Sequence, residues 1–257
     1  MRRTLAAAIS LALSVAAVDA FAQAPAPHND APPVVNATTQ LPRNVRPTHY
    51  TIAVVPNAQA LTFTGNIKIA LDVLQPTDKI VLNAVDMTFP KATLTGAKGK
   101  AMTAKVGTDK DAQTATFSFD KPLEAGSYVL ELDYTGKIGT QANGLFAIDY
   151  ENKQGKQRAL YTQFEASDAR KFIPSWDEPN YKAMFDLSAD VPKDHMALSN
   201  MPIAQAKDLG NGLQRVTFQT SPKMSTYLLF FGVGDFERAT KQVGPTQIGR
   251  ASCRERV

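Results

Sequence analysis

Gln163 and Glu165 are the residues of this chain whose types and spacing could do chemistry together. If the segment Leu160–Glu165 is extended, both side chains leave one face of the strand while Phe164 packs on the other face. A carboxylate beside an amide oxygen can accept charge-assisted hydrogen bonds from an ammonium group, such as the free N-terminus of a peptide. The same spacing also fits two solvated polar residues on the wet face of a strand, and spacing alone favours this simpler interpretation.

The two residues belong to a longer polar and aromatic run with a recognisable pattern. It reads Y-T-Q-F-E-A-S-D-A-R over 161–170 and P-S-W-D-E-P over 174–179. This run resembles the signature T-Q-F-E-A-T-D-A-R…F-P-C-F-D-E-P in the N-terminal domain of aminopeptidase N-type zinc metallopeptidases, with modest departures at Ser175 and Trp176. A second string, Tyr227–Glu237, resembles Y-L-L-A-F-V-V-G-D-F-E, the last strand of that domain before the catalytic domain.

The resemblance covers roughly Leu41–Gln247 and implies a role for each of the two residues. The residue matching Glu165 belongs to the site that holds the substrate's free α-amine, and the residue matching Gln163 lines the same pocket beside the first substrate side chain. Both would bind and orient the peptide, because a fixed amine acceptor restricts cleavage to the chain end. The resemblance therefore implies peptides with a free N-terminus as substrates, the catalytic domain of the same protein as a partner, and zinc as cofactor of the complete enzyme.

The other polar residues of the run are predicted to be structural. Asp168 and Arg170 lie in the segment Glu165–Phe172, which could form one or two helical turns, and Asp168 could cap the start or pair with a neighbouring arginine. The sequence W-D-E-P over 176–179 is typical of a turn, with Trp176 as an anchor in the core.

No catalytic residue and no metal ligand is predicted in this chain. Asp177 and Glu178 could be read as a catalytic carboxylate pair, but adjacent side chains seldom converge on one bond. A zinc peptidase of this type needs H-E-x-x-H on a helix, a further Glu and a G-x-M-E-N strand, and these strings do not occur. The histidines His28, His49 and His195 lack ligand spacing. The fragment alone is therefore predicted to be inactive.

The first 24 residues have the form of a secretory signal peptide. Arg2 and Arg3 make a basic start, Leu5–Val18 is apolar, and Ala22–Ala24 offers a small-x-small cleavage pattern. An uncleaved anchor or a buried helix is the alternative. We expect an exported protein, periplasmic or secreted, with no membrane association indicated after cleavage.

The net charge is concentrated at the two ends of the sequence. The last ten residues, Ile248–Val257, resemble the translation of a sequencing-library adapter, with an ordinary basic tail as the alternative. They contribute +2 and the first 24 residues contribute +1 to a formal charge of +4, which leaves +1 for the rest. This balance gives no reason to expect a nucleic-acid partner. The only cysteine also lies in this tail, so a disulfide or thiolate site is excluded from the rest.

Several segments between the ends alternate apolar and polar residues with a period of two. Such alternation predicts half-buried strands, and many short strands separated by turns predict an all-β fold: an antiparallel β-sandwich or saddle-like sheet with one or two short helical turns, preceded by a signal peptide helix. The continuously apolar Tyr227–Phe231 predicts a strand buried on both faces. The clearest alternating segments are Ile67–Val73, Tyr128–Tyr134 and Phe185–Val191.

These patterns predict a domain layout and a leading function. The layout is a signal peptide over 1–24, a Pro/Ala-rich leader over 25–40, an N-terminal β domain over 41–240, the start of a link to an absent catalytic domain over 241–247, and the adapter-like tail over 248–257. The leading hypothesis is the N-terminal substrate-binding domain of an exported zinc-dependent aminopeptidase. The alternative is a stand-alone exported β-sandwich that binds peptides or proteins, or a zinc-less relative.

Overall fold

The computed structural model describes residues 41–96, 99–152 and 155–253. The described residues belong to one compact unit, whose regular structure consists of strands and two short 3₁₀ turns. The predicted all-β class is therefore confirmed. The predicted signal peptide helix and leader lie outside the described residues. No helix within the described ranges is long and apolar enough to cross a membrane.

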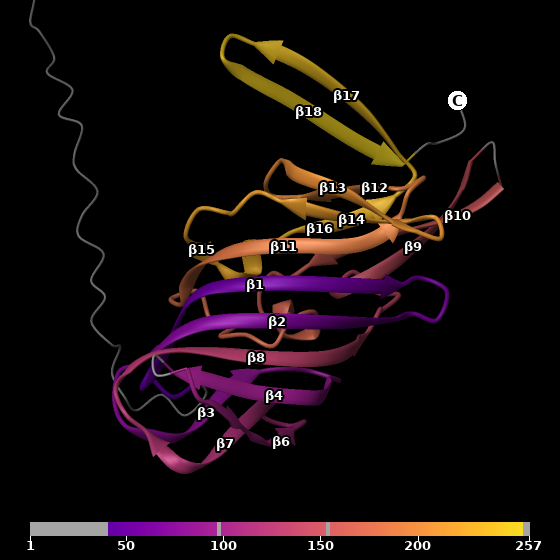
Figure 1. The fold of residues 1–257 in the computed structure, drawn as a ribbon. Helices are drawn as coiled ribbons and strands as arrows, with labels where there is room; N and C mark the ends of the chain where they lie inside the picture. Colours follow the sequence, from indigo (N-terminus) through magenta and orange to yellow (C-terminus); the bar gives the residue numbers. More distant parts are fainter. Residues whose placement is uncertain (1–40, 97–98, 153–154, 254–257) are drawn as a thin grey trace, which may run out of the picture. The chain divides into compact units, whose positions relative to one another are not determined.

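The largest sheet has nine strands and supplies one wall of the core (Figure 1). Its strands are β1 (Val45–Asn57), β2 (Thr62–Val73), β4 (Thr88–Gly96), β5 (Ala101–Thr103), β8 (Gly126–Lys137), β11 (Lys182–Pro192), β13 (Ile203–Gly210), β14 (Leu213–Phe218) and β15 (Met224–Ser225). Their order is β13-β14-β11-β1-β2-β8-β4-β5, and β15 also pairs with β11. β1 and β11 run parallel, and the other pairs of this sheet are antiparallel.

Three smaller sheets and two 3₁₀ turns complete the described structure. A four-stranded sheet has the order β12-β16-β10-β9, a three-stranded sheet has the order β3-β7-β6, and β17 pairs with β18. The bounds are β9 (Gly144–Asn152), β10 (Gly155–Gln163), β12 (Met196–Ser199), β16 (Phe231–Gly234), β3 (Thr77–Asn83), β6 (Lys105–Asp109), β7 (Thr114–Leu123), β17 (Phe236–Val243), β18 (Thr246–Cys253), η1 (Ala169–Lys171) and η2 (Thr226–Leu228).

One hydrophobic cluster joins the large sheet to the smaller ones. The alternation predicted for β2 is confirmed, because Ile67, Ile69, Leu71 and Val73 are all buried. The Phe172 ring bridges the sheets: its centroid lies 5.6 Å from that of Phe63 on β2 and 6.2 Å from that of Phe231 on β16. Trp176 is 1% exposed, which confirms it as a core anchor, and its backbone N–H donates to the Tyr50 hydroxyl at 3.2 Å.

The prediction for Tyr227–Phe231 is wrong. This segment is not a strand buried on both faces: it begins inside η2, and Leu228 is 47% exposed. Asn200 explains the difference, since its amide nitrogen donates to the Leu228 carbonyl at 2.8 Å and its oxygen accepts from the Phe230 N–H at 2.7 Å. These bonds satisfy backbone groups that a strand would otherwise have paired.

Candidate functional site

Gln163 and Glu165 lie at the C-terminal end of β10, a central strand of the four-stranded sheet. Gln163 is the last residue of β10, and Glu165 follows in the turn beyond it. Both are exposed, while Phe164 between them is 2% exposed, so the predicted alternation is confirmed. Within the described residues, neither side chain has a hydrogen-bond or ion-pair partner. The side chains of Gln163 and Glu165 are therefore exposed, and their oxygen atoms are available to accept hydrogen bonds. The peptide bond between Glu165 and Ala166 is cis.

The turn that carries Glu165 is held from beneath. The Phe164 carbonyl accepts the Asp168 N–H at 2.9 Å, which closes the turn. The Phe164 ring stacks on Phe172, with centroids 5.7 Å apart. One residue before Gln163, the Thr162 hydroxyl accepts the Phe231 N–H at 2.8 Å. The backbone that carries the two exposed side chains is therefore held in place by the buried residues Phe164 and Thr162.

Gly144 on β9 lies opposite Gln163 in the sheet register. Its φ is +65°, and a Cβ built there would lie 2.7 Å from the Lys171 Cβ. Lys171 in turn bonds to Asp168 at 2.9 Å and to the Asn143 oxygen at 3.1 Å. Asp168 therefore pairs with a lysine instead of the expected arginine, and it makes no cap bond to η1. A residue larger than glycine at 144 would push η1 away from the edge of the sheet.

Arg170 and Asp177 form a buried pair that ties the run to the core. The Arg170 Nε donates to Asp177 Oδ2 at 2.9 Å, and the Arg170 backbone N–H donates to the same oxygen at 3.2 Å. The Asp177 N–H donates to the Asn83 oxygen at 3.1 Å, and the Arg170 carbonyl accepts the Val85 N–H at 2.8 Å. Burial raises the pKa of the Asp177 carboxyl, and the Arg170 hydrogen bond opposes that rise. These contacts support the predicted structural role.

Glu178 engages a different part of the molecule from Asp177. Its carboxylate bonds to Arg43 at 2.8 Å and accepts the Leu41 N–H at 2.7 Å. Arg43 also lies over the Tyr181 ring, 5.0 Å from its centroid. The two neighbouring acids therefore hold separate segments, which argues against a catalytic carboxylate pair.

The described residues do not form a zinc site. No group of three or more His, Cys, Asp or Glu that could hold a metal is found in the part of the chain that the structure describes. His49 Nε2 lies 2.8 Å from Asp186, and His195 Nδ1 lies 2.9 Å from Asp194, so each histidine is engaged in a separate pair. His28 lies outside the described residues. Residues of this kind and spacing do not fit a catalytic zinc.

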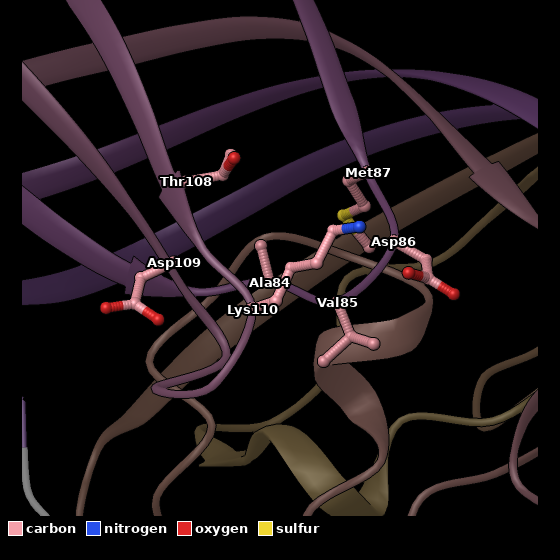
Figure 2. Close-up of a pocket in the computed structure, with 7 residues that line it drawn as sticks. All are labelled: Ala84, Val85, Asp86, Met87, Thr108, Asp109 and Lys110. Carbon is pink, nitrogen blue, oxygen red and sulfur yellow. The ribbon is translucent and has the colours of Figure 1, made fainter.

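A shallow pocket of about 100 Å³ lies elsewhere, between the link from β3 to β4 and the end of β6. Figure 2 shows the Lys110 side chain reaching across it toward Met87, with Asp86 and Asp109 pointing apart. Asp86 pairs with Lys137 at 3.4 Å, and Asp109 accepts backbone N–H groups of its own turn. The acids of this pocket are therefore already occupied, unlike Glu165.

Residues 46–228 match the Peptidase M1 N-terminal domain family. The chain belongs to that family. It is 37% identical to an Aminopeptidase N of Acetobacter pasteurianus, over 82% of this chain and 59% of the relative. It is 36% identical to Aminopeptidase M1-C of Oryza sativa subsp. japonica and 32% identical to Endoplasmic reticulum aminopeptidase 1 of Homo sapiens. Those matches cover 90% and 79% of this chain, but only 27% and 22% of the relatives. This M1 N-terminal domain therefore spans less than two thirds of these relatives, and the resemblance inferred from the sequence is confirmed.

Sequence reasoning missed the neighbours of the candidate site in the M1 N-terminal domain. The pairing of β9 with β10 and the position of η1 bring three residues next to the end of β10: Asn143, Gly144 and Lys171. Asn143 and Gly144 gave a turn signal, but nothing local indicated that Lys171 packs on them. The glycine opposite Gln163 can be identified only when the register between β9 and β10 is known.

Proposed function

We propose that this M1 N-terminal domain is the substrate-binding part of an exported zinc-dependent aminopeptidase that removes N-terminal residues from peptides. The observation that carries the proposal is the contrast among the acids of the run. Asp168, Asp177 and Glu178 are each paired with a cation, whereas exposed Glu165 has no partner among the described residues. An unpaired, exposed carboxylate is suited to bind an ammonium group from outside.

In this proposal Glu165 accepts the free α-amine, and Gln163 lies beside the first side chain of the peptide. Both orient the substrate, so that the first peptide bond is presented for cleavage. The zinc ion and its ligands belong to the catalytic domain of the same protein, where the metal supplies an activated water. The domain alone hydrolyses nothing. Export is supported by the signal-like pattern of the first 24 residues.

The test uses the protein together with its catalytic domain and an amino-acid anilide as substrate. A hydrogen bond to a charged group contributes about 1.5–3 kcal/mol, so Glu165→Gln should raise KM by about ten- to a hundredfold. Glu124→Gln is the matched control, since Glu124 is an exposed glutamate whose side chain has no partner within the described residues. Unchanged kinetics of both Glu165→Gln and Glu165→Ala would remove Glu165 from the amine site.

A further inference from the structure

Phe230 directly precedes β16, the strand that pairs with β10 near Gln163. β10 and β16 are antiparallel and pair Leu160 with Val233 and Tyr161 with Gly232. Next to these pairs, the Phe231 N–H donates to the Thr162 hydroxyl at 2.8 Å, so Phe230 lies at the Gln163 end of the pairing. Phe230 is half-buried.

Gly232 determines where the Phe230 ring lies. A Cβ built on Gly232 would lie 3.2 Å from the Cζ of Phe230 and 3.6 Å from its Cε1. The ring therefore covers the position that a side chain at 232 would fill, on the face shared by Tyr161 and Gln163. A side chain at 232 would require the ring to shift by a few tenths of an ångström.

The backbone around Phe230 is fixed from the side of β12. Its N–H donates to the Asn200 oxygen at 2.7 Å, and its carbonyl accepts the Ser199 hydroxyl at 2.7 Å. Asn200 also holds the carbonyl of Leu228, whose side chain is exposed. Phe230 and Leu228 thus form a positioned apolar surface next to the two polar acceptors.

On the opposite flank of Gln163, the residues that the structure describes leave no acidic group free for a cationic side chain. There Gly144 has no side chain, and Lys171 packs against it with its ammonium held by Asp168 and Asn143. Asp168 is already paired, so it is not free to bind a second cation. A substrate whose first side chain is apolar therefore fits better between Phe230 and Gly144 than one whose first side chain is cationic.

We propose that Phe230 is a specificity-determining residue that contacts the first side chain of the peptide and favours apolar N-terminal residues. This inference rests on the proposed function, because it takes Glu165 as the acceptor of the adjacent α-amine. With the amine held there, the first side chain extends over Gln163 toward the Phe230 ring. Burial of its apolar surface against the ring supplies the preference.

The experiment compares anilides of alanine, leucine, phenylalanine and lysine on the protein with its catalytic domain. Phe230→Ala should lower kcat/KM for the leucine and phenylalanine substrates about tenfold relative to the alanine substrate, mainly through KM, and leave the lysine substrate unchanged. Phe230→Leu should keep most of the preference. Leu213→Ala, at an exposed apolar residue of β14, is the control. Gly232→Ala, which pushes the ring without removing it, provides a second variant should Phe230→Ala fail to fold.

The outcomes separate this inference from the proposed function. A loss that is equal for all four substrates in Phe230→Ala and in Gly232→Ala would overturn the specificity role. If Glu165→Gln then still raised KM, the proposed amine site would stand without Phe230. No effect of Glu165→Gln on any substrate would overturn both.

Discussion

The buried pair of Arg170 and Asp177 provides a direct test of which residues in 161–179 stabilise the fold and which bind substrate. The Asp177 side chain is 2% exposed and that of Arg170 is 15% exposed. Removing one partner of a buried pair costs about 3–5 kcal/mol, because the other charge is left uncompensated. In Asp177→Asn, Arg170 keeps its bonds to the Gln113 side chain at 3.0 Å and to the backbone carbonyl of residue 177 at 3.2 Å. Asp177→Asn is therefore expected to lower the free energy of unfolding by about 3 kcal/mol, the low end of this range.

Urea unfolding of the described domain, followed by tryptophan fluorescence, measures this cost. The single tryptophan, Trp176, precedes Asp177 and is buried, so the signal reports on this region. Arg170→Met should cost a similar amount, and the double variant should cost about 2 kcal/mol less than the sum of the two, since neither charge is then left alone. Lys105→Met is the control: it breaks a pair whose two side chains are each 81% exposed, and no measurable change is expected.

Two results would refute this reasoning. A loss below about 1 kcal/mol for Asp177→Asn, or strictly additive effects in the double variant, would show that the pair does not stabilise the fold. In the protein with its catalytic domain, at a temperature where Asp177→Asn is folded, the KM of this variant for an anilide should equal that of the parent protein. A raised KM in that folded variant would place Asp177 in the binding site instead.

Three further predictions concern the site's support, the core and the isolated domain. Gly144→Ala should cost about 2 kcal/mol in urea unfolding, because of its positive φ and the close Lys171 side chain, while Gly107→Ala, with open space around it, should be neutral. Burial raises the pKa of Tyr50, Tyr134 and Tyr181, so these three of the seven tyrosines should ionise above the ordinary range in a near-ultraviolet titration. Because the unfolded phenols ionise first, stability should be intact below about pH 10 and fall as pH rises further, which denaturant midpoints would show. The isolated chain should neither hydrolyse an anilide nor retain stoichiometric zinc after dialysis; zinc-dependent hydrolysis by the chain alone would contradict the assignment of the zinc ligands to a separate domain.

The strands with one buried face could be predicted from the sequence. β2, β8 and β11 show period-two alternation because one face of each packs on the core. β6 and β13 escaped prediction for the converse reason. Every residue of these two edge strands is exposed, so neither carries an apolar stripe. Each pairs only with the strand that follows it in the chain, and the register of β13 is irregular.

The candidate site could be predicted in part. The alternation at Gln163, Phe164 and Glu165 is local, and it was visible in the sequence because it needs only an extended backbone. The surroundings were not visible. Lys171 reaches Asn143 across 28 residues, and Asn200 holds Phe230 across 30, so both contacts depend on the tertiary fold. The same long-range bonds explain why Tyr227–Phe231 departs from the strand that its composition predicts.

The measurement that tests the central claim most directly compares a dipeptide with its N-acetylated form as inhibitors of the protein with its catalytic domain. Acetylation removes the ammonium group and leaves the side chains in place. The account predicts that the free dipeptide binds more tightly than the acetylated one by at least tenfold, and that Glu165→Gln reduces this ratio toward one while Glu124→Gln preserves it. A ratio that is the same in the parent protein and in Glu165→Gln would contradict the claim that Glu165 holds the free amine.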